Sequence, residues 1–220
     1  LGAWGPSSRV QRGAAWAAHG PRSDDSRLGG QLDVAVAGSQ ARPMAQPSTV
    51  RRFDVELSDS DRSVYERLEL RVAQHPSESD RYLVARVLAR CLEHAEGLDF
   101  SKGICVGDEP ALWRHDATGR LLDWVEVGLP SVERLHKASK AAPRVAVYGW
   151  RGLPQLLEEL GSARVHRAEH LELFQFPQAF LDAIAERLER GNRWELSVVG
   201  GGLYLTVEGA LIEGKLERLQ

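Results

Sequence analysis

The sequence predicts a mixed α/β protein with antiparallel strands at both ends of a single folded domain. Runs of alternating apolar and polar residues occur near both ends of that domain. In the middle, a strand, a helix and a strand follow one another at the spacing of a parallel crossover. The composition, 43% hydrophobic and 27% charged over 220 residues, is ordinary for a globular chain that buries a core.

Charge and cysteine content limit the classes of function. The formal net charge of −3 excludes a globally basic coat for nucleic acid, although a local basic groove remains compatible with it. No stretch approaches the roughly 18 apolar residues of a membrane span, so we expect no membrane partner. No secretory signal is visible, and Cys91 and Cys105 form no metal-like or disulfide-dense pattern. We therefore expect free thiols and a cytoplasmic protein.

The first 43 residues differ from the rest of the chain. Gly, Pro and Ser supply 15 of these 43 positions, and the apolar residues follow no helical or strand period. Such a segment buries too little surface to offset its ordering entropy. The only methionine is Met44. We therefore interpret residues 1–43 as a disordered or spurious extension, with Met44 as the native start of a domain over 44–220.

Five elements are expected in the first part of the domain. They are strands at 50–57 and 65–72, a helix at 78–95, and short strands near 99–104 and 109–113. We expect Ser77 to cap the helix, because a serine oxygen accepts hydrogen bonds from free amides at a helix start. Val84, Leu88 and Cys91 contribute to its apolar stripe, while Arg86 is expected on another face.

The second part alternates strands and helices before a final hairpin. We expect a strand at 121–127, a helix at 131–142, a strand at 144–148, a helix at 153–160, a strand at 171–176, a helix at 178–190, and a hairpin of 194–199 with 203–208. The run Gly200–Gly202 between the last two strands predicts a turn that needs positive φ. No internal repeat is present.

Two further motif matches carry little weight. Gly209 to Lys215 has the spacing of a phosphate-binding loop, but Leu216 stands where Ser or Thr should hold magnesium, and no helix follows. His166 to His170 has the His-x-x-Glu-His spacing of a zinc peptidase. This segment runs straight into a strand pattern, so exposed loop histidines are the better interpretation.

A series of short motifs resembles the YaeQ family of bacterial proteins over roughly residues 50 to 208. In order they are His75-Pro76-Ser77-Glu78, Lys102-Gly103, Asp108-Glu109-Pro110-x-x-Trp113, Thr118-Gly119, Trp124-Val125-Glu126-Val127-Gly128-Leu129-Pro130 and Arg134-x-x-Lys137-Ala138. The resemblance implies a restriction-endonuclease-like core of the PD-(D/E)xK type: helix, three-stranded meander, helix, strand. It implies no established activity, and a fold alone supplies none.

Nuclease chemistry on such a core would need a divalent metal. Carboxylates hold Mg²⁺ or Mn²⁺ against a phosphate oxygen and a water, and a lysine stabilises the developing charge. We predict Glu126, on the central strand, as the main metal ligand and Glu109 as a second one. Lys137 matches the family lysine and is predicted as the charge stabiliser. Glu78 is predicted as a supporting acid.

Structural explanations compete with these roles. Ala111 stands where the nuclease pattern wants an acid, which favours loss of the metal site. Glu78 also suits a helix start, and Lys137 lies one turn after Glu133, an ordinary surface pair. A carboxylate on a central strand is costly without a partner, which favours a site role for Glu126.

Two hypotheses remain open. One is a metal-dependent phosphodiesterase acting on nucleic acid through a degraded metal site. The other is a non-catalytic nuclease-like fold that binds nucleic acid or a protein. Arg134, Lys137 and Lys140 would give either protein one basic helix.

Overall fold

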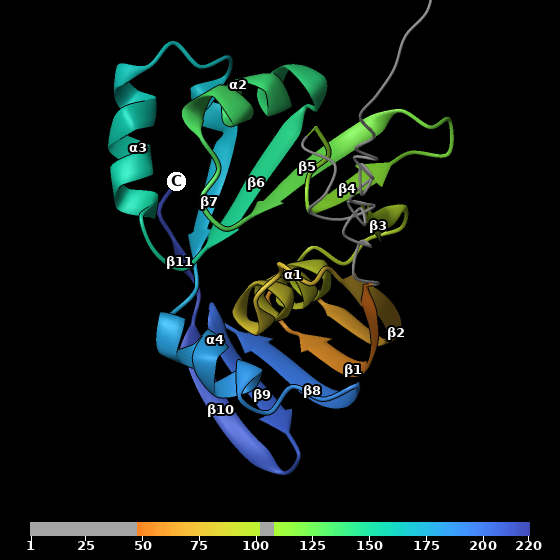
Figure 1. Cartoon of the computed structure of the whole chain (residues 1–220). Coiled ribbons are helices and arrows are strands. Elements are labelled where there is room, and N and C mark those ends of the chain that lie inside the picture. The colour runs from red at the N-terminus through yellow and green to blue at the C-terminus, as the bar shows by residue number, and fades with distance from the viewer. Residues whose placement is uncertain (1–47, 102–107) are drawn as a thin grey trace, which may run out of the picture. The chain divides into compact units, whose positions relative to one another are not determined.

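Two β-sheets and four α-helices make up the described part of the chain, residues 48–101 and 108–220 of a computed structural model (Figure 1). The extension expected over residues 1–43 and the Cys105 thiol lie outside these described residues. The expected order of elements is confirmed, with two additions at the C-terminal end. No helix in the described ranges is long and apolar enough to cross a membrane.

The five-stranded sheet joins the beginning of the domain to its end. Its strands, in spatial order, are β10 (Ala210–Lys215), β9 (Gly202–Val207), β8 (Gly191–Val199), β1 (Thr49–Asp59) and β2 (Val64–Gln74). β1 pairs with β2 antiparallel and with β8 in parallel, so two hairpins distant in sequence form one surface. Alternate residues of β1 and β8 are buried, as a half-covered sheet requires.

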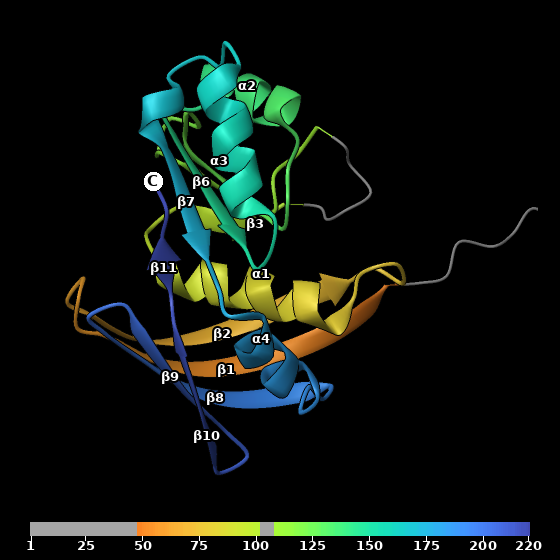
Figure 2. The ribbon, with the colours of Figure 1, turned by 90° about the vertical axis from the view of Figure 1, so that its left-hand side faces the viewer.

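The six-stranded sheet combines an antiparallel meander with parallel strands. Its order is β11 (Glu217–Arg218), β7 (Leu171–Gln175), β6 (Arg144–Gly149), β5 (Leu121–Val127), β4 (Leu112–His115) and β3 (Leu98–Phe100). The first three strands in the sequence pair antiparallel, whereas β5, β6 and β7 run parallel. Helices α2 (Val132–Ala141) and α3 (Leu153–Ser162) cover one face of this sheet (Figures 1 and 2).

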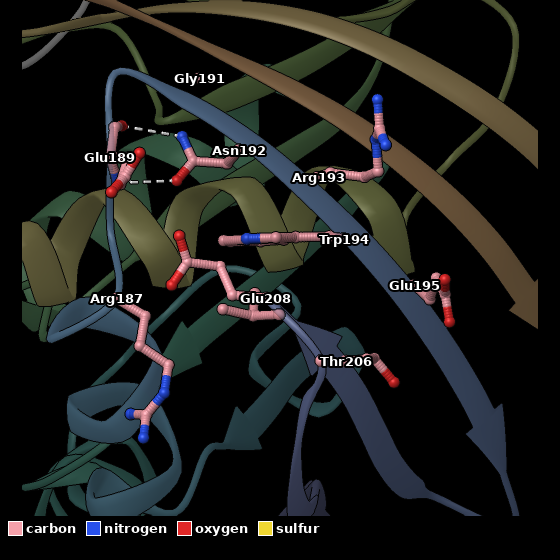
Figure 3. A pocket seen from close by; sticks show the side chains of 11 residues that line it. Arg187, Glu189, Gly191, Asn192, Arg193, Trp194, Glu195, Thr206 and Glu208 are labelled. Carbon is pink, nitrogen blue, oxygen red and sulfur yellow. Dashed lines mark hydrogen bonds between the residues drawn. The ribbon is translucent and has the colours of Figure 1, made fainter.

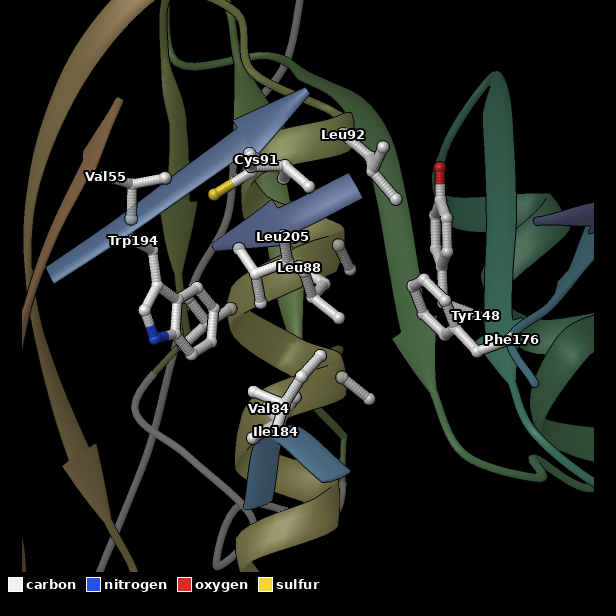
Figure 4. Packing of buried hydrophobic residues seen from close by; sticks show 14 of the residues in the cluster. Val55, Val84, Leu88, Cys91, Leu92, Tyr148, Phe176, Ile184, Trp194 and Leu205 are labelled. Carbon is white, nitrogen blue, oxygen red and sulfur yellow. The ribbon is translucent and has the colours of Figure 1, made fainter. Parts of the chain in front are cut away.

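Helix α1 (Asp80–Leu92) lies between the two sheets, as Figure 2 shows. Its side chains face both sheets: Val84 and Leu88 lie near Trp194 and Leu205, while Leu92 lies toward Tyr148 (Figure 4). Nine of its 13 residues are buried, Arg86 among them. Helix α4 (Gln178–Ala185) packs beside α1 and against β10.

Two details of α1 differ from expectation. Its cap is Ser79, whose Oγ accepts a hydrogen bond from the Tyr82 amide at 3.2 Å, and not Ser77. The one-sided stripe was also wrong, because Arg86 is only 2% exposed. The cause is the second sheet, which covers the side of the helix that the sequence pattern left to solvent.

Smaller differences concern boundaries and the C-terminal end. Helix α4 ends at Ala185 rather than 190. The run from Gly209 to Lys215 contains strand β10, so the phosphate-loop match is confirmed as coincidence. Gly200 and Gly201 adopt positive φ in the β8–β9 hairpin, as predicted. The Cys91 thiol is buried without a disulfide, and burial raises its pKa to about 12.

Candidate functional site

Glu126 lies buried on β5, on the face that α2 covers. Its neighbour on the same side of the strand, Trp124, donates an indole N–H to the Glu126 Oε1 at 2.6 Å. Arg134 of α2 donates its Nε–H to the same oxygen at 2.7 Å. The carboxylate side chain is 6% exposed and the guanidinium 29%. A buried acid on a central strand therefore has a charged partner and a neutral donor, as its burial requires.

Arg134 also brings the segment before β4 to this corner of the sheet. Ser131 caps α2 by accepting the Arg134 amide at 3.2 Å, which places the arginine in the first turn beside β5. The Arg134 Nη2 donates to the backbone carbonyl of Glu109 at 2.6 Å. The structure thus brings Glu126 and the backbone of Glu109 to one arginine.

Glu78 forms a second buried ion pair just before α1. Its carboxylate lies 2.9 Å from the Arg86 Nη2, and both side chains are almost fully enclosed. The His75 amide donates to the Glu78 Oε2 at 3.2 Å, and Arg86 also donates to the carbonyl of Ala73 at 2.9 Å. Burial raises the pKa of Glu78 above its usual value, and the Arg86 charge offsets part of that rise.

Tyr82 of α1 lies beside Gly128 at the end of β5. Burial raises the pKa of its phenol to about 12, with smaller opposing effects from the arginines and the glutamates of both pairs. Gly128, at the end of β5 with φ of 94°, faces the Tyr82 ring: a Cβ there would be 3.5 Å from the Tyr82 Cε2. This corner is at the carboxyl end of parallel strands, where α/β proteins commonly bind ligands.

Lys137 is on the other side of α2. Its ammonium group is 67% exposed and pairs with Glu133 at 3.6 Å, the ordinary i, i+4 surface pair. At about 3.6 residues per turn, Lys137 points away from the buried Leu135, whereas Arg134 lies at the flank of that buried face. The helical period could have indicated Arg134 as the partner of Glu126. The catalytic roles assigned to Glu126, Lys137 and Glu78 stay predictions.

The donor set does not fit a divalent metal. The Glu126 Oε1 accepts two hydrogen bonds, one of them from a guanidinium. Ala111 precedes Leu112, which pairs with Val125, so the same register places an alanine next to Glu126. Within residues 48–101 and 108–220, no group of three or more His, Cys, Asp or Glu is arranged to hold a metal ion.

The zinc-like motif is an exposed turn, as expected. Residues Ala168–His170 form a short 3-10 helix before β7. His170 is 66% exposed and lies 3.6 Å from the Glu169 carboxylate. The backbone amide of His166 donates to the His136 Nδ1 of α2 at 3.2 Å. Sequence reasoning did not anticipate this link between the turn and α2.

The fold and the corner beside Glu126 define an α/β protein of two sheets separated by a central helix. The family description "YaeQ protein" matches residues 44–215, so the chain belongs to the YaeQ family. The uncharacterized protein YaeQ of Escherichia coli is 27% identical over 179 residues, which cover 80% of this chain and 98% of that protein.

Two solved structures show the same fold. The crystal structure of YaeQ protein from Xanthomonas axonopodis pv. citri is 30% identical with a TM-score of 0.73, covering 79% of this chain and 98% of that one. The crystal structure of YaeQ protein from Pseudomonas syringae gives the same identity and TM-score, covering 80% and 98%.

Proposed function

We propose that this chain is a nuclease-like protein that binds nucleic acid and does not cleave it through a metal ion. The observation that carries the proposal is the ion pair between Arg134 and Glu126, at 2.7 Å. In a metal-dependent nuclease, the acid of the central strand must offer its oxygens to a cation. Here an arginine of the chain itself supplies that positive charge.

The order of elements supports the nuclease-like part of the proposal. Helix α1 is followed by the antiparallel strands β3, β4 and β5, then by α2 and by β6, which is parallel to β5. A restriction-endonuclease-like core has the same succession of helix, meander, helix and strand. This agreement concerns the scaffold, and the chemistry has to be argued from the residues.

The charges of α2 favour nucleic acid over a protein partner. Arg134 neutralises Glu126, so a phosphate approaching this corner meets no uncompensated carboxylate there. Lys137 and Lys140 are exposed on the same helix. Because the folded domain carries an excess of acids elsewhere, the electrostatic attraction should be local and strongly weakened by salt.

Binding and cleavage are tested together with the full chain. A labelled oligonucleotide is titrated at low salt in EDTA and again with millimolar Mg²⁺ or Mn²⁺, followed by fluorescence anisotropy and by gel analysis. We expect equal binding with and without metal, and an intact oligonucleotide. Metal-dependent cleavage would overturn the proposal in favour of a phosphodiesterase that uses Glu126, Glu109, Lys137 and Glu78. Absence of binding at low salt would contradict it as well.

A second experiment restores an acid at position 111, where the nuclease pattern has one and this chain has alanine. Ala111→Asp adds a carboxylate beside Glu126, and Ala111→Asn adds the same volume without the charge. If the alanine is one reason why the site does not fit a metal, calorimetry should detect Mn²⁺ binding only in the aspartate variant. Mn²⁺ binding of equal strength in the unaltered chain would show that the donor set already suffices.

A further inference from the structure

A small hollow at the far end of α2 is lined on one side by that helix and on the other by the turns before β5 and β7. Its volume is about 250 Å³. The basic side chains among its lining residues are Arg120, Lys140, His166 and Arg167. No acidic side chain lines it in the described part of the chain.

The three full charges around this hollow form no ion pair within the described residues. Arg120, Lys140 and Arg167 are exposed, and none has a carboxylate within 4 Å among residues 48–101 and 108–220. Asp123, three residues after Arg120, pairs with Arg114, and Glu169, two residues after Arg167, lies 3.6 Å from His170. Asp116 is used within its own turn: its Oδ1 accepts from the Thr118 hydroxyl at 2.6 Å and from the Arg120 amide at 3.0 Å. The Arg120 charge also helps to lower the pKa of Asp116, after the hydrogen bonds of that turn. Lys140 and Arg167 keep their full charge for an anion that enters the hollow, and positive charge remains in excess there.

The backbone around the hollow is fixed in an uncommon conformation. Arg167 has φ of 50°, a left-handed geometry that costs energy for any residue with a Cβ. Its carbonyl accepts the His170 amide at 2.9 Å, which starts the short helix before β7. The bond between His166 and His136 ties the same turn to α2. Held conformations of this kind recur at binding sites, because they fix the direction of a side chain.

Two other hollows provide a comparison. One of about 310 Å³ lies beside the start of β8, and three glutamates accompany its arginines: Glu189, Glu195 and Glu208 (Figure 3). Another, of about 780 Å³, contains Arg52, Arg71 and Arg193, but also Asp54 and Glu69. Mixed charge of this kind is typical of a solvated sheet face. The hollow at α2 differs because its charges all have one sign.

The end of α2 itself opposes an anion only weakly. A helix carboxyl end carries about half a negative charge, and Lys140 in the last turn compensates it. Arg120 and Arg167 then remain in excess. Arginine is suited to this role because its guanidinium can bind two phosphate oxygens at once.

We propose that this hollow binds a phosphate group through Arg120, Lys140 and Arg167. On the proposed function, on which this assignment rests, the phosphate belongs to the backbone of the bound nucleic acid strand. Lys140 lies six residues after Arg134, about 9 Å along the helix axis at about 1.5 Å per residue. One strand following α2 could thus contact both the corner at Glu126 and the hollow.

The test compares two double variants of the full chain with equal loss of charge. Arg120→Gln with Arg167→Asn removes two arginines from the hollow, and asparagine tolerates the left-handed conformation at 167. Arg52→Gln with Arg71→Gln removes two exposed arginines from the mixed-charge face. Dissociation constants for a short labelled single strand are measured at several salt concentrations. Circular dichroism and thermal melting verify that both variants are folded.

We expect the hollow variant to weaken binding at least about ten-fold. We also expect it to reduce the slope of log K against log salt by about 0.7, the value for one lost phosphate contact of a single strand. The control variant should weaken binding less than about three-fold, through long-range charge alone. Equal weakening in both variants, or none in the hollow variant, would overturn the inference while leaving nucleic-acid binding intact.

A titration with inorganic phosphate tests the phosphate site in the hollow separately from nucleic-acid binding by the chain. If the unaltered chain binds no oligonucleotide, but millimolar phosphate raises its melting temperature and leaves that of the hollow variant unchanged, then the proposed function fails. The hollow would stand as a site for a small phosphorylated molecule. If neither ligand distinguishes the unaltered chain from the hollow variant, the hollow binds no phosphate and the inference is wrong.

Discussion

Truncation of Arg134 to alanine should reveal how much the Glu126 corner depends on its internal cation. The variant leaves a carboxylate that is 6% exposed and accepts a hydrogen bond from the Trp124 indole N–H at 2.6 Å. Removing one partner of a buried ion pair lowers the free energy of unfolding by about 3 to 5 kcal/mol, because the other charge stays buried without compensation. Because the Arg134 side chain is itself 29% exposed, water can reach part of the gap, and we expect about 3 kcal/mol, the lower end of that range.

Urea denaturation at pH 7 measures this loss directly. A loss of about 3 kcal/mol lowers the midpoint by about 1 to 3 M, for a slope of about 1 to 3 kcal/mol per M. Adding Glu126→Gln to Arg134→Ala should recover part of the stability, since the uncompensated charge is then gone.

Lys137→Ala is the matched control on the same helix. Its ammonium group forms an exposed i, i+4 pair with Glu133, which is expected to contribute about 0.3 kcal/mol. The reasoning about the Glu126 corner is refuted if Arg134→Ala loses no more stability than this control, or if adding Glu126→Gln recovers none of the loss.

Three further predictions concern stability. Glu78→Gln leaves the enclosed Arg86 without its counter-charge and should lower the free energy of unfolding, measured in urea, by about 3 kcal/mol. Adding Arg86→Met should restore much of this stability, because no buried charge is then unpaired. No recovery in the double variant would contradict this explanation. Gly149→Ala places a Cβ 2.8 Å from the Gly128 carbonyl oxygen and should lower the free energy of unfolding by about 1 to 3 kcal/mol. Gly161→Ala is the control and should leave stability unchanged, because its Cβ meets nothing within 4 Å. Burial, assisted by a neighbouring arginine charge, lowers the pKa of His94, so the unfolded chain binds a proton at this histidine more readily than the folded chain does. The free energy of unfolding should therefore fall as the pH drops below about 6.5. Thermal melts from pH 7.5 to 5 should show a weaker dependence of stability on pH in His94→Gln.

The order of helices and strands followed from local patterns. The run 121–127 was predicted to the residue, because an apolar core strand between two turns has clear ends. The strand at 210–215 was missed, since a glycine and alternating polar residues resemble a loop when its partner strand is not considered. The cap of α1 was placed at Ser77 instead of Ser79 because both serines satisfy the same local rule.

The candidate site was only partly accessible to sequence reasoning. Glu126 and Glu78 were singled out, and both prove to be buried carboxylates. Their cations, Arg134 and Arg86, were not assigned, because each pair spans eight residues and closes only when a helix packs against its neighbours. Lys137 resembles a site residue in the motif, yet the orientation of α2 directs it to solvent beside Glu133.

Local patterns were enough to predict most helices and strands, their order and the family. Hydrophobic period, turn residues and motif spacing are properties of short stretches of sequence. Only the packed structure shows that β1 lies parallel to β8, that most of α1 is buried between the two sheets, and that a hollow lined by basic side chains forms where the turns before β5 and β7 meet α2. These features depend on contacts between segments far apart in the chain, whose geometry is fixed by packing of the whole core and not by any local preference.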